Sequence, residues 1–323
     1  MVCSSRSHIR VVANRNRPSV AGAWSLLAAA ALASCGGGGG GTSPPLVVDP
    51  PPVIVEDERA YTVLTERTLD ADGDGIGLSA YDLIRALGGS GSIESPDLYP
   101  VNHPGVAHIY EGSDAEVGNH FVFVIHRDID IDRDRVDITD RQRNEIKTFD
   151  RSEEAVKGYE NETFVFTWKF RINPAMEVST RFTHFFQLKA VGGEDSHPIL
   201  TISGAERSGE DGLEVRHSPL QQDDILDRVA WNDVAGNWIE VYCRATFADN
   251  GELRLIAKQL ADDRVLFNID AGSLDLWRGE SADHFVRPKW GIYRSLLDAD
   301  NLRPDEEAVH FANFSIREVM LSD

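Results

Sequence analysis

Hydrophobic and polar residues alternate along most of the chain beyond residue 100, at the period of two that is typical of half-buried strands. The runs at 120–126, 163–172, 181–191, 199–203, 213–216, 238–247, 252–258, 265–269, 290–295 and 309–319 are short and rich in β-branched or aromatic residues. Turn residues such as Asp249, Asn250 and Gly251 separate them. Because no helices alternate with these strands, the pattern predicts one β-sandwich domain rather than two domains.

One segment before residue 100 has helical spacing. Tyr81, Leu83, Ile84 and Leu87 recur at the interval of one helical face, and two glycines follow at 88 and 89. The sequence therefore predicts a short N-terminal helix over residues 79–87.

The first 55 residues have the composition of an export signal and a tether. Four arginines precede an apolar run at 20–33, which ends in Leu32-Ala33-Ser34-Cys35 and resembles a bacterial lipobox. We expect residues 1–34 to be a lipoprotein signal peptide, Cys35 to be lipidated, and the Gly/Pro-rich residues 35–55 to form a tether before a domain at 56–323. This predicts an exported bacterial lipoprotein, anchored in the outer membrane or at the cell surface. A plain secretory signal is the alternative.

Charge and cysteine content narrow the function classes. The 323 residues include 32 Lys and Arg against 53 Asp and Glu, a formal net charge of −21. This charge argues against general nucleic-acid binding, but it permits an anionic ligand in a locally basic groove. If Cys3 is removed and Cys35 is lipidated, Cys243 has no disulfide partner. Its place on an alternating apolar face predicts a buried structural thiol.

An acidic segment resembles part of a calcium-binding loop. Asp70, Asp72 and Asp74 alternate and are followed by Gly75, but Tyr81 stands where a complete loop would carry a bidentate glutamate. A structural Ca²⁺ and a solvated acidic turn both remain open.

Four aspartates alternate between residues 128 and 134, interleaved with arginines. We interpret this stretch as a self-neutralising polar loop or strand end. His126, which ends an apolar strand, and His184, assigned to the core side of its strand, are both expected to be structural.

Three strand-like segments carry the candidate chemistry. Alternation gives each of them an apolar face and a face with long polar side chains. The polar faces are predicted to present Arg141, Arg143, Glu145 and Lys147 from the first segment, Phe185, Gln187 and Lys189 from the second, and Lys289, Gly291 and Tyr293 from the third. Gly291 would leave space for a flat ligand to approach the backbone. Such a groove, lined by cations, an amide and a phenol, suits an anionic chain.

The ordered set Arg143-Asn-Glu145, Gln187-Leu-Lys189 and Lys289-Trp-Gly-Ile-Tyr293 resembles the signature strands of β-jelly-roll polysaccharide lyases. Alginate lyases of that architecture carry Arg-x-Glu, Gln-x-His and Lys-x-Gly-x-Tyr, so Lys189 stands here in place of histidine. With lysine at this position, the sequence is most similar to the ulvan lyases of polysaccharide lyase family 28. The similarity also includes residues 97–109, 120–135, 140–147 and 185–189. The resemblance covers residues 60–320 and implies an all-β jelly roll of two antiparallel sheets.

The resemblance implies β-elimination at a uronic acid. That reaction removes a weakly acidic C5 proton beside a carboxylate, which must first be neutralised. Arg143 and Gln187 are the candidates for this task, with Glu145 orienting Arg143. Catalysis would then require no metal cofactor, and any Ca²⁺ would be structural.

Lys189 is the favoured general base and Tyr293 the general acid, although one tyrosine could perform both tasks. A lysine base needs a pKa well below about 10.4, and the neighbouring cations Arg141, Arg143 and Lys289 would lower it by repulsion.

The residues predicted to contact substrate are Arg141, Glu145, Lys289, Tyr242 and Arg244. Of these, the four other than Glu145 are expected to bind its sulfate and uronate groups. The expected substrate is an acidic, sulfated, uronate-containing polymer. Ulvan is the first choice, with glucuronan, alginate or a glycosaminoglycan as alternatives, and we expect the protein to act as a monomer.

Two other functions compete. A glycoside hydrolase of similar fold would need paired carboxylates across the groove, and no strand carries that spacing. A surface glycan-binding lipoprotein would use the same basic groove without requiring Lys189 and Tyr293 together. Lyase activity on a polysaccharide therefore distinguishes a lyase from a glycan-binding lipoprotein.

Overall fold

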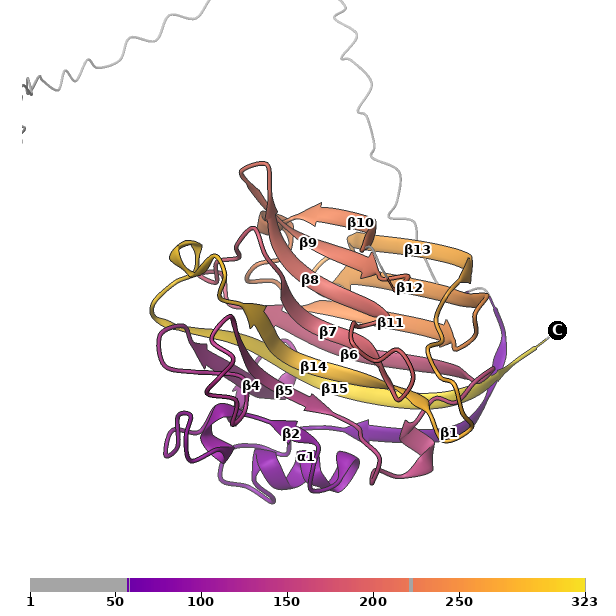
Figure 1. Ribbon diagram of the computed structural model, residues 1–323, viewed down its shortest axis with the longest axis horizontal. Helices are drawn as coiled ribbons and strands as arrows, with labels where there is room; N and C mark the ends of the chain where they lie inside the picture. Colours follow the sequence, from indigo (N-terminus) through magenta and orange to yellow (C-terminus); the bar gives the residue numbers. More distant parts are fainter. Residues whose placement is uncertain (1–56, 58, 221–222, 323) are drawn as a thin grey trace, which may run out of the picture. The chain divides into compact units, whose positions relative to one another are not determined.

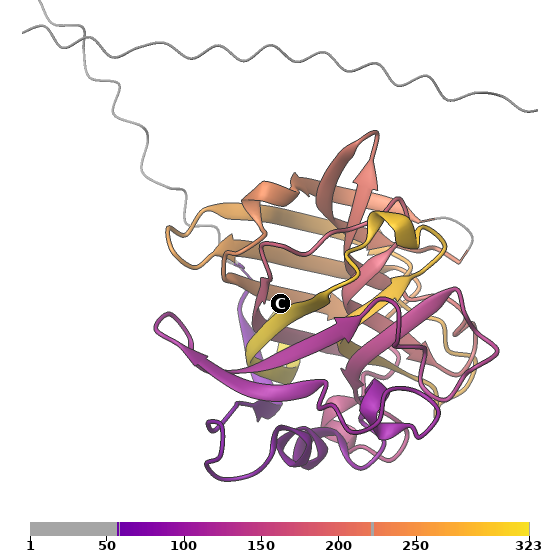
Figure 2. The same ribbon diagram turned by 90° about the vertical axis from the view of Figure 1, so that its left-hand side faces the viewer.

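The computed structural model describes residue 57, residues 59–220 and residues 223–322. The expected signal peptide (1–34), the lipidation site Cys35 and the tether (35–55) lie outside these residues. The described part folds as two antiparallel sheets that pack face to face with one short α-helix beside them (Figures 1 and 2), which confirms the predicted all-β sandwich.

The eight-stranded sheet has the order β13 (Val265–Leu274), β12 (Gly251–Gln259), β11 (Ile239–Thr246), β6 (Thr163–Ile172), β15 (Glu306–Leu321), β4 (Gly118–His126) and β3 (Ile109–Asp114), and β1 (Tyr61–Leu69) also pairs with β15. The seven-stranded sheet has the order β10 (Asp224–Ala230), β9 (Glu210–His217), β8 (Leu200–Arg207), β7 (Thr183–Val191), β14 (Phe285–Ser295), β5 (Arg141–Lys147) and β2 (Ile93–Glu94).

The strands that the sequence did not predict are β1, β2, β3 and β10. Most side chains of β1 are exposed, and β2 has two residues, so neither presents an apolar alternation. Pairing with a neighbouring strand, rather than local pattern, makes these segments extended.

The helix α1 (Ala80–Gly88) matches the predicted segment. The hydroxyl of Ser79 accepts a hydrogen bond from the backbone N–H of Asp82 and caps the first turn. Gly89, at a φ of 86°, ends the helix. Four short 3₁₀ turns lie at Pro96–Leu98, Glu154–Val156, Trp231–Asp233 and Ala299–Asn301. No helix among the described residues is long and apolar enough to cross a membrane.

Aromatic side chains fill the space between the two sheets. Trp168 of β6 packs against Phe186 of β7 at a ring-centroid distance of 4.4 Å and against Trp290 of β14 at 6.0 Å. These contacts join strands of opposite sheets, so the face of the seven-stranded sheet that points away from them is free to form a site. Cys243 lies fully buried in the same core, as predicted, and burial raises its pKa to about 12.

Candidate functional site

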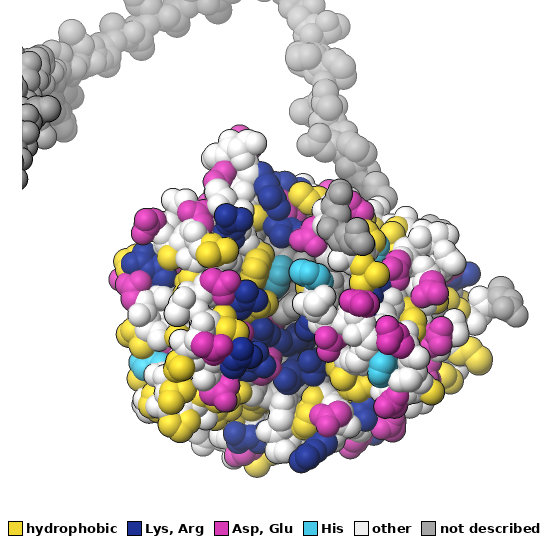
Figure 3. Space-filling model, in the orientation of Figure 1, with side chains coloured by type: hydrophobic (Ala, Val, Ile, Leu, Met, Phe, Trp, Pro, Cys, Tyr) yellow, Lys and Arg dark blue, Asp and Glu magenta, His cyan; other side chains and the backbone are white. Residues whose placement is uncertain are grey.

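The outer face of the seven-stranded sheet carries a basic cleft. Its volume is about 620 Å³, and side chains from β5, β7, β8, β9 and β14 line it. Seven lining side chains are basic and two are acidic: Arg133, Arg141, Arg143, Arg181, Lys189, Arg207 and Arg216 against Asp132 and Asp223. Figure 3 shows the Lys and Arg side chains gathered around this hollow. A protein with a net charge of −21 therefore has a locally cationic groove.

Strand register brings the sequence-predicted residues together. Tyr293 of β14 lies opposite Arg143 of β5, and Lys289 of β14 lies opposite Gln187 of β7. Residues paired across adjacent antiparallel strands project from the same face. Arg141, Arg143, Gln187, Lys189 and Tyr293, all predicted from sequence, line the same cleft.

Arg143 is held by carboxylates and by an aromatic ring. Its Nη1 lies 2.6 Å from Glu145 and 3.3 Å from Glu94, and its Nε donates to Asp132 at 2.9 Å. The guanidinium carbon lies 3.8 Å from the ring centroid of Tyr293. The expected orientation of Arg143 by Glu145 is present, and among the described residues Nη2 is the guanidinium nitrogen left for a ligand.

Lys289 and Glu145 lie beneath the cleft rather than in it. Lys289 is 1% exposed, and its Nζ lies 2.8 Å from Glu94 and 2.7 Å from Glu145. Gln187 also donates to Glu145 from its amide. The prediction that Lys289 and Glu145 contact substrate is therefore wrong, because each is enclosed by oppositely charged or polar neighbours. Both support residues that line the surface.

Glu94 was not predicted, although it is central to this ion-pair cluster. Burial acts to raise its pKa, but Lys289, Arg143 and Lys147 outweigh burial and hold the pKa well below its usual range. Glu94 belongs to the two-residue strand β2, which pairs with β5. No local sequence signal identifies it, because its partners are brought to it only by the fold.

The pKa of Lys189 is lowered, as the sequence predicted, and besides burial, Lys289 and Arg143 are among the causes. Burial first, and then the charge of Lys289, lower its pKa to about 8. Its Nζ donates to the backbone carbonyl of Asp195. About a tenth of the amine is therefore uncharged at pH 7.

Arg141 contacts the phenol of Tyr293 directly. Its Nη1 donates to the phenol oxygen at 3.1 Å. The other edge of the guanidinium donates to Asp140 at 2.7 and 2.8 Å, which fixes its orientation. Arg141 thus positions the hydroxyl of Tyr293 as well as facing the cleft.

His184 lies on the cleft face, against the prediction. β7 carries one extra residue, Phe185, relative to β8, between the pairs of His184 with Ser203 and Phe186 with Ile202. This bulge places Phe185 in the core and turns His184 toward Tyr293, its partner across β7 and β14. Strict alternation cannot reveal a bulge, so both residues were assigned to the wrong face.

The imidazole of His184 is neutral and has a fixed orientation. Burial, and then the charges of Arg216, Arg143, Lys289 and Lys189, hold its pKa well below the usual range. The hydroxyl of Ser203 donates its hydrogen to Thr201. The oxygen of Ser203, 2.7 Å from the Nδ1 of His184, must therefore accept a hydrogen bond from that nitrogen. This tautomer leaves Nε2 as a proton acceptor.

Arg207 and Arg216 form a second cationic group on the cleft wall. Both donate to the buried carboxylate of Glu214, from Nε at 3.0 Å and 2.7 Å respectively. Sequence reasoning did not single them out, since neither lies within the three signature segments.

Gly291 has a different role from the one predicted. Its φ is 140°, and a Cβ there would overlap the carbonyl oxygen of Asn144 on β5. The missing side chain allows β14 and β5 to approach each other. It does not open a space for ligand.

Tyr242 and Arg244 lie on the other sheet, so the prediction that they line the groove is wrong. β11 belongs to the eight-stranded sheet, and Tyr242 and Arg244 project from its outer face toward Asp57. Arg244 pairs with that aspartate at 2.6 Å. Alternation identified their face correctly, but it does not tell to which sheet a strand belongs.

The acidic loop does not bring its carboxylates together in the described structure. Asp72 accepts from the backbone N–H of Leu78 at 3.0 Å, and Asp70 accepts from Asn313 at 3.2 Å. Asp74 is exposed. The one group of metal-ligand donors in the described part of the chain is elsewhere, at His103, His108, His126 and Asp130.

Comparisons with known proteins support the fold. No protein-family model and no curated protein matches the sequence. Among solved structures, the alginate lyase Aly36B in complex with an alginate trisaccharide matches with a TM-score of 0.53 and 8% identity, over 80% of this chain and 100% of that chain. The PL-14 alginate lyase of Aplysia kurodai matches with a TM-score of 0.51 and 8% identity, over 81% of this chain and 100% of that chain. The described domain has the jelly-roll fold of these proteins.

Proposed function

We propose that the protein is a polysaccharide lyase that cleaves an anionic, uronate-containing polymer by β-elimination. One observation carries this proposal: Lys189, with a pKa of about 8, and Tyr293 share a cation-lined cleft on the outer face of the sheet. A glycan-binding protein has no need for Lys189 and Tyr293 together in such a cleft. The similarity in fold to two alginate lyases agrees with the assignment.

The first task of the site is to neutralise the substrate carboxylate. Nη2 of Arg143 and the remaining amide hydrogen of Gln187 are the donors available, because Glu145 and Asp132 engage the other guanidinium nitrogens and one amide hydrogen. A neutralised carboxylate accepts the charge that develops when the C5 proton leaves. These donors are held before substrate arrives, so the reaction requires little rearrangement.

Proton transfer is assigned to Lys189 and Tyr293. The uncharged amine of Lys189 takes the C5 proton, and the phenol of Tyr293 gives its proton to the departing O4 oxygen. Arg141, which donates to the phenol oxygen, stabilises the charge left there. At pH 7, a pKa of about 8 leaves roughly a tenth of the lysine uncharged, about two hundred times more than a free lysine would have.

We propose ulvan as the substrate, with glucuronan, alginate and glycosaminoglycans as the alternatives. Six arginines around the cleft suit a polymer that carries sulfate as well as carboxylate, because guanidinium groups bind both in a bidentate manner. The resemblance of the signature segments to ulvan lyases supports the same choice.

The test is ultraviolet absorbance of the unsaturated uronate product. The purified protein is incubated with ulvan, glucuronan, alginate, heparan sulfate and chondroitin sulfate in separate assays. Absorbance that rises with ulvan supports both the reaction and the substrate, and a rise with another polymer keeps the reaction and changes the substrate. Binding without any rise in absorbance identifies a glycan-binding protein instead.

We also propose that the domain is exported and tethered by a lipid on Cys35. The lipobox-like sequence and the following Gly/Pro-rich segment support this placement. Intact-mass measurement of protein from a bacterial membrane fraction should show a diacylated or triacylated N-terminus at Cys35. The Cys35→Ser variant should be absent from the membrane fraction. Equal amounts of the variant and the wild type in that fraction would contradict the proposed lipid anchor.

A further inference from the structure

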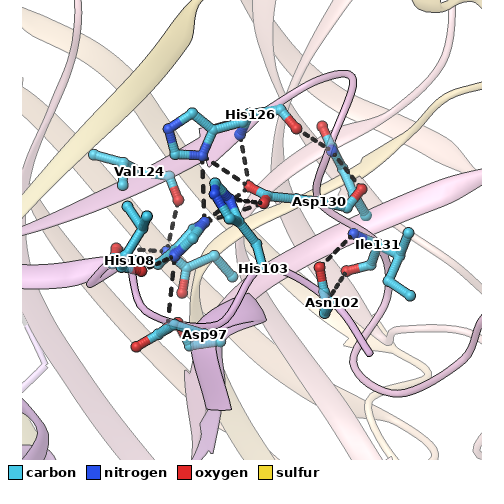
Figure 4. Close-up of polar contacts among 12 residues, drawn as sticks. Asp97, Asn102, His103, His108, Val124, His126, Asp130 and Ile131 are labelled. Carbon is cyan, nitrogen blue, oxygen red and sulfur yellow. Dashed lines mark hydrogen bonds and ion pairs between the residues drawn. The ribbon is translucent and has the colours of Figure 1, made fainter. Parts of the chain in front are cut away.

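Three histidines and an aspartate converge beside the cleft, from separate parts of the chain. His103 and His108 come from the loop before β3, His126 ends β4, and Asp130 follows in the next loop. Each offers one ligand atom, and all four atoms lie within 4.8 Å of one another. Figure 4 shows the three imidazole rings turned toward the carboxylate of Asp130.

Outer hydrogen bonds fix which imidazole nitrogens face inward. The Nδ1 of His108 lies 2.6 Å from the carbonyl oxygen of Val106, which can only accept. The Nε2 of His126 lies 3.2 Å from the carboxylate of Glu306, so it is also a donor. In their neutral forms, both rings therefore turn an unprotonated nitrogen inward.

Several lone pairs meet at the centre of the cluster as a result. The inward nitrogens of His108 and His126 lie 3.3 Å apart, and they lie 3.1 and 3.3 Å from oxygens of Asp130. Asp130 is fully buried at its side chain, so water does not offset the repulsion among these acceptors. A positive charge at the centre, either a metal ion or added protons, is needed to hold them together.

The spacing and chemistry fit zinc. Zn²⁺ binds imidazole nitrogen and carboxylate oxygen at about 2.0–2.2 Å, which places tetrahedral ligands about 3.3 Å apart. Oδ1 of Asp130 lies 2.9 Å from His103 and 3.1 Å from His108, Oδ2 lies 3.3 Å from His126, and the four ligand atoms all lie within 4.8 Å of one another. Ca²⁺ and Mg²⁺ prefer all-oxygen ligand sets, so three nitrogen donors disfavour them.

We propose that these four side chains bind one Zn²⁺ in a closed, four-coordinate structural site. Four protein donors complete a tetrahedron and leave no position for substrate. Glu306 on His126 and the Val106 carbonyl on His108 supply the outer hydrogen bonds that orient metal-bound imidazoles.

A short loop connects this cluster to the cleft. Two residues after Asp130, Asp132 accepts from Arg143 at 2.9 Å and from Arg133 at 2.9 Å, and both arginines line the cleft. Asn102, next to His103, donates to the backbone carbonyls of Ile131 and Arg133 in the same loop. A metal ion at the cluster would therefore fix the loop that positions Asp132.

Metal analysis of untagged protein tests the site. Wild-type protein purified without chelator should contain about one zinc per chain by inductively coupled plasma mass spectrometry. His103→Ala, whose side chain is only partly buried on a loop, should lose at least nine-tenths of it. The control is His310→Ala, which removes a histidine from a pair with His120 that lies outside the cluster. It should retain full zinc content.

Two further measurements keep the test independent of folding. Glu306→Gln alters an exposed outer residue and should weaken Zn²⁺ affinity about tenfold without changing stoichiometry. Chelator-treated wild type should melt at a higher temperature when Zn²⁺ is returned, whereas His103→Ala should not respond. Metal-free wild type with no measurable Zn²⁺ affinity would overturn the proposal in favour of protons at the centre. Equal zinc content in wild type and His103→Ala would overturn it as well.

Discussion

The guanidinium group of Arg143 lies over the ring of Tyr293, with 3.8 Å between the guanidinium carbon and the ring centroid. Arg141 holds the other end of the same side chain through its phenol oxygen. Tyr293 is thus fixed at its ring and at its hydroxyl by two arginines of β5. The groups proposed to neutralise the carboxylate and to protonate the leaving oxygen form one packed unit.

The proton-transfer roles predict severe losses from two single substitutions. Lys189→Ala and Tyr293→Phe should each lower kcat by at least about 10²-fold, because each removes a positioned acid or base. Product absorbance on the preferred polymer measures the loss, and circular dichroism checks the fold. Lys169→Ala, on the eight-stranded sheet, is the matched control and should retain activity. Near-normal turnover in Lys189→Ala would remove that residue from the mechanism.

The lowered pKa of Lys189 predicts an alkaline rise in rate. Only the uncharged amine can accept a proton, so kcat/KM should increase with pH below about 8 and level off above it. A pH series between 6 and roughly 10 at constant ionic strength would show this limb. If the limb persists unchanged in the residual activity of Lys189→Ala, the titrating group is another residue.

His184 predicts a smaller effect. Its ring stacks on Phe182 at a centroid distance of 4.5 Å and lies opposite Tyr293, so His184→Asn should disturb the position of the phenol. We expect kcat to fall about tenfold with Lys189 still acting as base. A loss as large as that of Tyr293→Phe would contradict this positioning role and would show that His184 is needed for the chemical step itself.

The buried ion-pair cluster predicts a loss of stability. Glu94→Gln leaves Lys289 and Arg143 with one carboxylate fewer in a buried site, which should lower the free energy of unfolding by about 3–5 kcal/mol. Urea denaturation at pH 7, where Glu94 is ionised, measures the change. Glu210→Gln, at an exposed position, should fall within about 0.5 kcal/mol of wild type. Equal stability of the two variants would show that the cluster contributes little.

Placement on opposite sheets predicts contrasting effects of two arginine changes. Arg141→Ala should raise KM and lower kcat, because Arg141 faces the cleft and holds Tyr293. Arg244→Ala should keep kcat/KM within about twofold of wild type, since it lies on the outer face of the other sheet. Steady-state kinetics on the same polymer compare them, and a strong loss in Arg244→Ala would point to a second binding face.

Much of the sandwich and part of the site could be predicted from sequence. Alternation located most strands, and the signature segments brought Arg143, Gln187, Lys189 and Tyr293 into one cleft. The environment of Lys189 was also anticipated, although burial contributes more than the neighbouring charges. The strands follow from local alternation, whereas the meeting of the signature segments was expected from their resemblance to jelly-roll lyases.

The remaining features depend on long-range placement. Glu94 meets Arg143 across 49 residues, and the bulge at Phe185 turns His184 to the opposite face. The metal-ligand cluster left a signal in the spacings His103-x₄-His108 and His126-x₃-Asp130, which could have suggested a site. The sheet to which Tyr242 belongs could not be derived, because alternation specifies a face and not a partner.

The close approach of β14 to β5 at Gly291 has a consequence for engineering substrate preference. The residues around Gly291 form the floor of the cleft, where Lys289 and Glu145 form a buried ion pair. Any side chain at position 291 would push β14 and β5 apart. The walls are different, since Arg133 and Arg207 keep about a third or more of their side chains exposed. Mutant libraries that vary the walls and spare the floor should therefore yield altered specificity without collapse of the scaffold.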